Sequence, residues 1–312
     1  MEADLTHWSA SWAALIGCGA AAACQLAGWR KLRAGAGKEQ RREAALFYGG
    51  LLVLLIGLVS PVGYLSGVYL WIRALQGLLI GIVGPGMIVL GAPWTAFRLA
   101  FTRGAVSDPA GSAGPAGSAD AMADPVALPD RLPEADRVAG RRRWLTAWPV
   151  AAVVLANAVW LAWQFPVLTD ASRGNVGLAL LEHASFVAAG LLFWLQLISS
   201  GPLRQQTPPL RRTALVVGTV AAWTVFGMML VFGSGVLYPG YQNSAHHLMT
   251  VLDDQQLSGA VWWMGILPPM IVVAVALMMH WLNDEESAEL SAGLDRLLTP
   301  RRHGWPSRPV IR

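Results

Sequence analysis

The sequence predicts an all-α polytopic membrane protein with seven transmembrane helices, its N-terminus outside and its C-terminus in the cytoplasm. Hydrophobic residues make up 54% of the 312 residues and charged residues 13%, which is about half the charge of an ordinary soluble domain. The mean hydropathy is +0.46. Seven stretches have the roughly 20 mostly apolar residues that a helix needs to cross a bilayer.

The seven predicted spans cover most of the chain. The first eight residues, MEADLTHW, contain no Lys or Arg, so the charged region of a cleavable signal peptide is missing and we expect the first span to be retained. A short loop at 169–174 joins the fourth and fifth spans. The predicted membrane domain extends over residues 8–286, with spans at 8–29, 45–67, 69–92, 147–168, 175–199, 213–235 and 257–282.

The basic residues predict the orientation. Of the 23 Lys and Arg residues, 21 lie in the first, third and fifth loops or in the C-terminal tail. The other loops contain only Arg173, and Arg73 lies within the third span. Because positively charged loops stay in the cytoplasm, we predict a bacterial inner-membrane protein whose sixth loop faces the periplasm or exterior. The basic residues flank spans instead of forming one stripe, which argues against a nucleic-acid partner.

Two segments are predicted to lie in the cytoplasm outside the spans. Residues 104–140 are rich in Gly, Ala, Pro, Ser and Asp and include PAGSAGPAGSAD, a composition typical of a disordered linker. Residues 287–312 form a tail, and the DEESAEL that follows Asn283 favours continuation of the last helix into water. No segment resembles a soluble catalytic domain, so we do not expect an enzyme.

Several membrane-protein and cofactor classes are excluded by missing residues. A retinal protein needs a lysine in its last span, whereas the only lysines, Lys31 and Lys38, lie in the first loop. The sequence contains no GxxxxGK[ST] loop, no HExxH motif and no CxxCH haem-attachment site. The two cysteines, Cys18 and Cys24, lie in an apolar stretch and are interpreted as packing residues.

Polar side chains gather in the outer third of the predicted bundle, and such residues within spans are functional candidates by default. They indicate either an outward-facing metal or partner site, or internal ion pairs and helix caps. The set comprises Arg73, Gln76, Glu182, His183, Met228 and Met229 in the spans, then His246, His247, Asp253, Asp254, Gln255 and Gln256 in and after the sixth loop.

Two hypotheses concern specific members of this set. Histidine and methionine suit copper, and methionine suits Cu(I) especially, so the candidate metal ligands are His183, Met228, Met229, His246 and His247. The alternatives are a buried hydrogen-bonded His183, exposed loop histidines and packing methionines. We also predict an intramembrane ion pair between Arg73 and Glu182, because an unpaired charge at that depth costs about 2–3 kcal/mol.

Several segments together carry a family resemblance. The resemblance rests on a basic stretch, a turn, two spans and two segments near the end of the membrane domain. These are GWRKLRAGAG, LVSPV, LQGLLIGIVGPGMIVLGAPW, LLEHASFVAAGLLFW, LYPGYQ and HWLNDEE. The most specific signature is Asp-Gln-Gln-x-x-Gly-x-x-x-Trp from Asp254 to Trp263, because its polar residues have no generic membrane role. On these residues, roughly 8–286 resembles the CtaG family of bacterial cytochrome c oxidase assembly proteins.

The resemblance implies an integral membrane factor that supports biogenesis of a haem-copper terminal oxidase, with oxidase subunits as partners and copper handled at the outer face. It also implies a histidine cluster at the start of the third span, where this chain has Arg73, Gln76 and Gly77, while His183 keeps the position of a family histidine. Two functions stay open: a copper-handling assembly factor, and a metal-free accessory subunit or scaffold bound to an oxidase or respiratory supercomplex. A transporter is less favoured because the inner half has few charges.

Overall fold

The computed structural model of the chain describes residues 12–32, 38–94, 97, 134–198, 207–243 and 249–298. The described residues form helices and contain no strand. Among them, six helices are long and apolar enough to cross a membrane, and a helix pair bent by 68° adds a seventh if it is counted as one span. The architecture is therefore the predicted all-α polytopic one.

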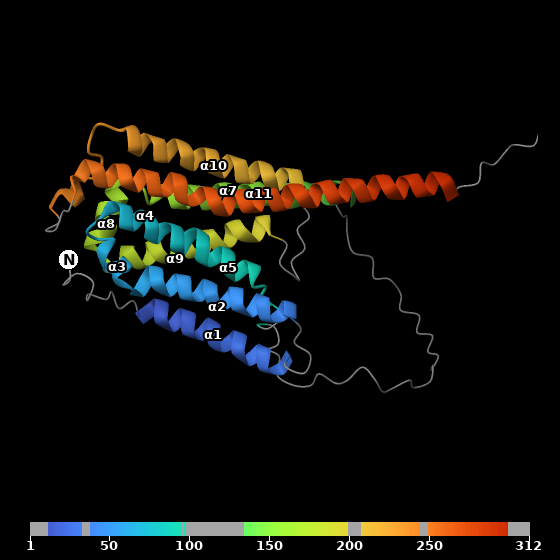
Figure 1. Ribbon diagram of the computed structural model, residues 1–312, viewed down its shortest axis with the longest axis horizontal. Helices are drawn as coiled ribbons and strands as arrows, with labels where there is room; N and C mark the ends of the chain where they lie inside the picture. The colour runs from blue at the N-terminus through green and yellow to red at the C-terminus, as the bar shows by residue number, and fades with distance from the viewer. Residues whose placement is uncertain are drawn as a thin grey trace, which may run out of the picture.

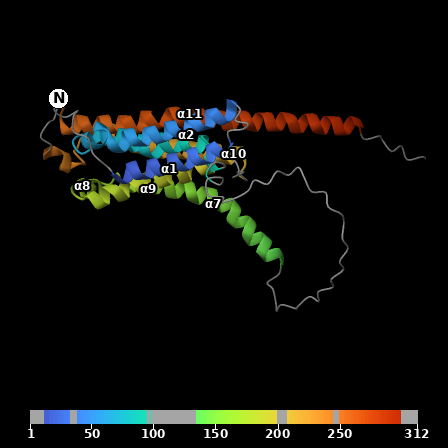
Figure 2. The same ribbon diagram turned by 90° about the horizontal axis from the view of Figure 1, so that it is seen from below.

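Within the bundle the long helices run side by side along one axis, and the first part of α7 slants away from it (Figures 1 and 2). Three short elements lie at the end of the bundle where α4 and α11 begin, and we call this end the polar end. At the opposite end, α11 extends well beyond the other helices (Figure 1). The long elements are α1 Trp12–Leu32, α2 Lys38–Val59, α4 Leu70–Leu78, η3 Leu79–Val83, α5 Gly84–Leu90, α7 Glu134–Ala162, α9 Val176–Leu197, α10 Pro209–Phe232 and α11 Val251–Leu298; the short ones are α3 Pro61–Leu65, α8 Pro166–Gly174 and the 3-10 helix η4 Pro239–Asn243.

The third span, built from α4, η3 and α5, is the most buried of the described spans and packs against α2, α9 and α11. Pro85 has no N–H to donate to the carbonyl of Gly81 four residues earlier, and the helix passes this point through the π-helical turn η3. The indole N–H of Trp194 in α9 donates to the Ile82 carbonyl at 2.8 Å. A Cβ at Gly190 would lie 2.7 Å from Pro85 Cγ, so this close crossing of α9 requires glycine.

A second close contact joins α10 and α11. A Cβ at Gly227 would lie 2.8 Å from the Gly259 carbonyl oxygen, and a Cβ at Gly259 would lie 2.6 Å from the Gly227 carbonyl oxygen. Next to this crossing, the rings of Trp223 and Trp262 stack with centroids 4.3 Å apart. The two glycines therefore set the distance between α10 and α11.

Replacing Gly227 by leucine is expected to lower the free energy of unfolding by about 1–3 kcal/mol, because the new side chain must push α10 away from α11. Thermal unfolding of the detergent-purified variant measures the loss. The matched control on the same helix is Gly218→Leu, since a Cβ at Gly218 meets nothing within 4 Å. Equal losses in the two variants would contradict the close contact as the cause.

The fourth predicted span, 147–168, is not one straight helix. The structure ends α7 at Ala162 and turns the chain by 68° into α8, which begins at Pro166. The ring of Pro166 suits the first turn of a new helix, where no N–H is needed. The Thr169 hydroxyl donates to the Trp163 carbonyl at 2.9 Å, which satisfies an acceptor left free by the bend.

Two helices extend beyond the predicted membrane boundaries. Helix α7 begins at Glu134, inside the range 104–140 that the sequence assigns to a disordered linker, while 104–133 lies outside the described residues. Helix α11 continues to Leu298, so most of the first half of the predicted tail is helical. Both extensions are rich in Glu, Ala, Arg and Leu, whose helix propensity favours the helical backbone without lipid around it.

Candidate functional site

An ion pair links the third and fifth spans at the polar end. Arg73 Nη2 lies 2.5 Å from Glu182 Oε1, and both side chains are nearly buried, with 11% and 7% of their surface exposed. The same Nη2 donates to Ser172 Oγ of α8 at 3.2 Å. The intramembrane ion pair expected from the sequence is therefore present, and it joins α4, α8 and α9.

Asp254 caps the N-terminus of α4. Its carboxylate accepts from the backbone N–H of Leu70 at 2.8 Å and from that of Trp71 at 3.0 Å. Tyr69, the residue at the N-cap position of α4, makes no such bond with its own side chain. Asp254 is fully buried, so a charge from the start of α11 satisfies two helix donors and complements the α4 dipole from 184 residues away.

The other polar residues of the signature hold the chain around the sixth loop. Gln255 Oε1 accepts from the Leu237 N–H at 2.7 Å and its Nε2 donates to the Gly235 carbonyl at 3.1 Å. Gln256 Nε2 donates to the carbonyl of Gly233 at 3.5 Å. The segment that leaves α10 is thus fixed to the first turns of α11.

Asp253 and Gln76 also make internal contacts. Asp253 is exposed, and its Oδ2 accepts from the Thr250 hydroxyl at 2.6 Å while its N–H donates to Thr250 Oγ1 at 3.1 Å, which caps α11. Gln76 is buried and donates through Nε2 to the Gly57 carbonyl at 2.8 Å. This bond fixes α4 against α2, one turn below the ion pair.

A layer of aromatic and basic residues covers the ion pair. Arg173 donates to the Gly67 carbonyl from Nε at 3.1 Å and from Nη2 at 2.7 Å, and its Cζ lies 4.0 Å from the ring centre of Tyr241. The phenol of Tyr241 donates to the Ser66 carbonyl at 3.0 Å, and that of Tyr238 donates to the Gln164 carbonyl at 2.6 Å.

Burial raises the pKa of both of these phenols. Desolvation raises the pKa of Tyr241 from 10.0 to about 12, against the opposing effect of Arg73 and Arg173. Desolvation likewise raises the pKa of Tyr238 to about 12. Both tyrosines act as hydrogen-bond donors, and together they join η4 and its flanking residues to the bend after α7, to α8 and to the turn after α3.

This layer was not among the predicted site residues. The sequence does carry a signal for it, since Tyr238 and Tyr241 lie in the LYPGYQ segment and Arg173 is the only basic residue in the second, fourth and sixth loops. Their contact partners are backbone carbonyls, which have no sequence signature. The contacts of this layer therefore could not be predicted from the sequence, because they depend on how the loops pack together in the structure.

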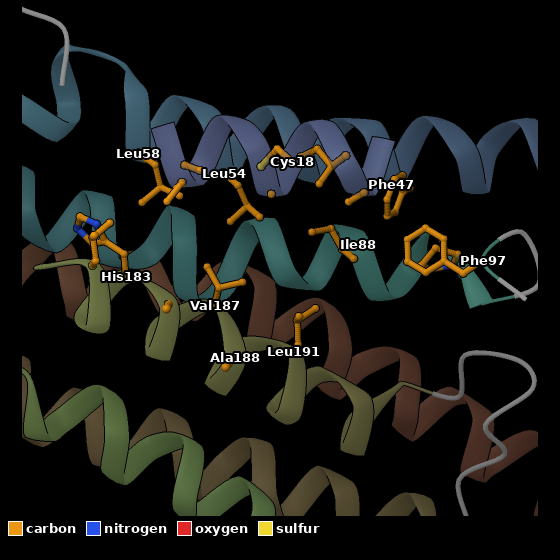
Figure 3. Close-up of a pocket in the computed structure, with 18 of the residues that line it drawn as sticks. Cys18, Phe47, Leu54, Leu58, Ile88, Phe97, His183, Val187, Ala188 and Leu191 are labelled. Atoms are coloured by element: carbon orange, nitrogen blue, oxygen red, sulfur yellow. The ribbon is translucent and has the colours of Figure 1, made fainter. Parts of the chain in front are cut away.

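His183 lies apart from this network. Its side chain lines a cavity between α1, α2, α5 and α9, together with apolar residues such as Leu58 and Leu180 (Figure 3). Among the described residues its ring makes no hydrogen bond. The adjacent Glu182 points to Arg73 instead, because neighbouring residues on a helix face different directions.

The candidate metal ligands in the described residues do not converge. Met228 and Met229 are 39% and 54% exposed on α10, which packs against α11, whereas His183 faces the cavity beside α1 and α2. His246 and His247 lie outside the described residues. Within the described part of the chain, no three His, Cys, Asp or Glu side chains lie close enough together to hold a metal ion. The candidate copper site stays a prediction, because two of its five residues lie outside the described part of the chain.

The curated relatives of this chain are distant in sequence. An uncharacterized protein of Mycobacterium leprae is 24% identical over 160 residues, which is 47% of this chain and 24% of the relative. Uncharacterized proteins of Mycobacterium bovis and Mycobacterium tuberculosis are each 25% identical over 163 residues, which is 48% of this chain and 24% of the relative. The chain thus spans about a quarter of the length of the curated relatives it matches. No solved structure matches the chain.

A family match covers most of the sequence. Residues 25–284 match the family described as cytochrome c oxidase caa3 assembly factor. This range includes the contacts described at the polar end and the α2, α5 and α9 walls of the cavity, but the α1 residues that line the cavity precede it. The chain belongs to the cytochrome c oxidase caa3 assembly factor family.

Proposed function

We propose that this protein supports the biogenesis of a haem-copper terminal oxidase in a bacterial inner membrane, acting as a metal-free scaffold whose polar end contacts oxidase subunits. The observation that carries the proposal is the interlocked polar end. The side chains of Arg73, Arg173 and Asp254 contact side chains or backbone groups of neighbouring elements. Together they join the turn after α3, α4, α8, α9, η4 and α11. A surface fixed in this way costs little entropy when a partner binds.

The distribution of basic residues supports an outward-facing polar end. The loops at the polar end contain Arg173 alone among the 23 Lys and Arg residues, and the opposite loops and the tail contain 21. Positively charged loops stay in the cytoplasm. In this orientation, the polar end meets the oxidase on the periplasmic or exterior side of the membrane.

Exposed apolar residues at the polar end suit a partner surface. Phe165 and Val167, at the bend between α7 and α8, are 65% and 79% exposed. The family resemblance implies a metal-binding histidine cluster at the start of the third span, and this chain has Arg73 there. The guanidinium of Arg73 is bound by Glu182 and Ser172. A cation tethered there disfavours a metal cation at the same place.

The test is a pull-down of the tagged protein in mild detergent with identification of the subunits recovered. We expect oxidase subunits at fixed stoichiometry. The double variant Phe165→Ser, Val167→Ser is expected to reduce their recovery by about tenfold, the factor that corresponds to 1.4 kcal/mol of binding. The control is Val225→Ser on α10, which is 70% exposed. Equal loss in the control, or no oxidase subunit in any sample, would contradict the proposal.

Copper handling is the second candidate, and one observation favours it: the His183 ring has no hydrogen-bond partner among the described residues and is free to bind a ligand. In this role copper is cargo for the oxidase, with His246 and His247 as further ligands. Metal analysis of protein purified from copper-replete cells distinguishes the two candidates. Two variants are compared with the wild type: the single variant His183→Ala and the double variant His246→Ala, His247→Ala. Copper that the wild type retains and both variants lose would favour copper handling over the metal-free scaffold.

A further inference from the structure

A cavity of about 550 Å³ lies within the membrane-spanning part of the protein, between α1, α2, α5 and α9 (Figure 3). Its size falls in the range of roughly 300–1,000 Å³ that small-molecule sites occupy. Nearly all of its lining is apolar, and the cavity is partly open. Helix α1, which packs on α2, supplies one wall of the cavity.

The cavity is elongated along the bundle. Figure 3 shows His183 at one end and Phe97 at the other, with Leu54, Ile88 and Val187 between them. Its α2 wall extends from Leu58 to Phe47, which is about 16 Å of helix at 1.5 Å per residue. A long apolar chain therefore fits the length of the cavity.

His183 is the polar group at one end of this apolar slot. A neutral imidazole carries one N–H donor and one acceptor nitrogen, and the described residues offer a hydrogen bond to neither. Polar groups in apolar surroundings are normally paired. An occupant with a hydrogen-bonding head at this end would complete the site.

The depth of His183 restricts the chemistry of that head. Helix α9 begins at Val176, so His183 lies about 10 Å along the helix from the polar end, while the whole helix of about 33 Å matches a hydrocarbon core of about 30 Å. A phosphate or another charged group at that depth is strongly disfavoured. An uncharged head with carbonyl oxygens is compatible with both the depth and the imidazole donor.

We propose that this cavity binds an isoprenoid quinone, with a carbonyl oxygen of the quinone ring accepting from the His183 imidazole and the isoprenoid tail lying between α1 and α9 toward Phe97. The small residues Ala184 and Ala188 of α9, with Gly17 of α1, leave the width that the tail needs. This site is separate from the polar-end surface and does not depend on the scaffold role.

The first experiment measures quinone and phospholipid in solvent extracts of the detergent-purified full-length protein. We expect about one quinone per chain in the wild type, and about tenfold less in Ala184→Phe, which fills the cavity. His183→Leu is expected to lose quinone severalfold because the head loses its donor. The matched control is Leu181→Phe, a residue on α9 that is 57% exposed and does not line the cavity. Phospholipid alone in the wild-type extract, or equal quinone in all four proteins, would overturn the proposal.

The second experiment does not depend on the variants folding. A benzoquinone with a photoreactive group on its tail is cross-linked to the wild-type protein in membranes, and the attachment sites are mapped by mass spectrometry. We expect labels on cavity residues such as Ala21, Ala188 and Leu191, and competition by unlabelled quinone. Labels spread over lipid-facing residues of α10, or labels that phospholipid displaces equally well, would overturn the proposal.

Discussion

Replacing Arg73 by alanine is expected to lower the free energy of unfolding by about 3–5 kcal/mol, because it leaves the carboxylate of Glu182 buried without its counter-charge. Glu182 is 6% exposed, so water cannot substitute for the guanidinium. The Ser172 hydroxyl loses a donor in the same change. Thermal unfolding of the purified variant in detergent measures the effect, and the exposed Arg211→Ala is the control, with an expected loss below about 0.5 kcal/mol.

A double variant separates the cost of a broken pair from the value of the pair itself. Arg73→Met combined with Glu182→Leu removes both charges and replaces them with apolar groups of similar volume. A buried ion pair exchanged in this way is often neutral in stability, so we expect most of the loss in Arg73→Ala to be recovered. A double variant as unstable as the single one would show that the Arg73 stem or the Ser172 contact carries the stability instead.

Replacing Asp254 by alanine is expected to cost about 2–4 kcal/mol, because two N–H groups at the start of α4 lose the buried carboxylate that accepts from them. Asp254→Asn keeps one acceptor oxygen and is expected to lose about half as much. Unfolding in detergent measures both variants.

The neighbouring aspartate provides the control for that prediction. Asp253 is exposed, and its side chain only accepts from the hydroxyl of Thr250, the residue that caps α11, so Asp253→Ala is expected to cost less than about 1 kcal/mol. Comparing Asp→Ala at positions 253 and 254 thus distinguishes a contact within α11 from the cap that α11 provides for α4. Similar losses at the two positions would contradict the cap of α4 by Asp254.

Much of the fold could be predicted because spanning helices satisfy their own backbone hydrogen bonds. A stretch such as 175–199 needs only enough apolar residues to become helix α9, and the structure has Val176–Leu197. The bend after Ala162 and the π turn before Gly84 were not predicted, since both depend on how a proline is accommodated by neighbouring helices. The helical start of α7 at Glu134 follows local propensity that the Pro- and Gly-rich composition around it concealed.

The candidate site divides in the same way. The free-energy cost of an unpaired charge in the membrane predicted the ion pair between Arg73 and Glu182, because the spans contain few other charged residues. The partners of Asp254, Gln255 and Gln76 are backbone groups, so residue types gave no indication of them. The sequence offered His183 as a metal ligand or a buried hydrogen-bonded residue, whereas the structure places it in a cavity formed by four helices, which exists only in the packed bundle.

By itself, the sequence determined which segments cross the membrane, where charge gathers and that a buried arginine must be paired, because hydropathy and the cost of an unpaired charge are local quantities. Only the tertiary structure decided that Asp254 caps α4 across 184 residues and that Glu182 and His183, adjacent in the chain, face an ion pair and an apolar slot. The physical reason is that such roles depend on which helix faces pack together, and packing joins residues far apart in sequence.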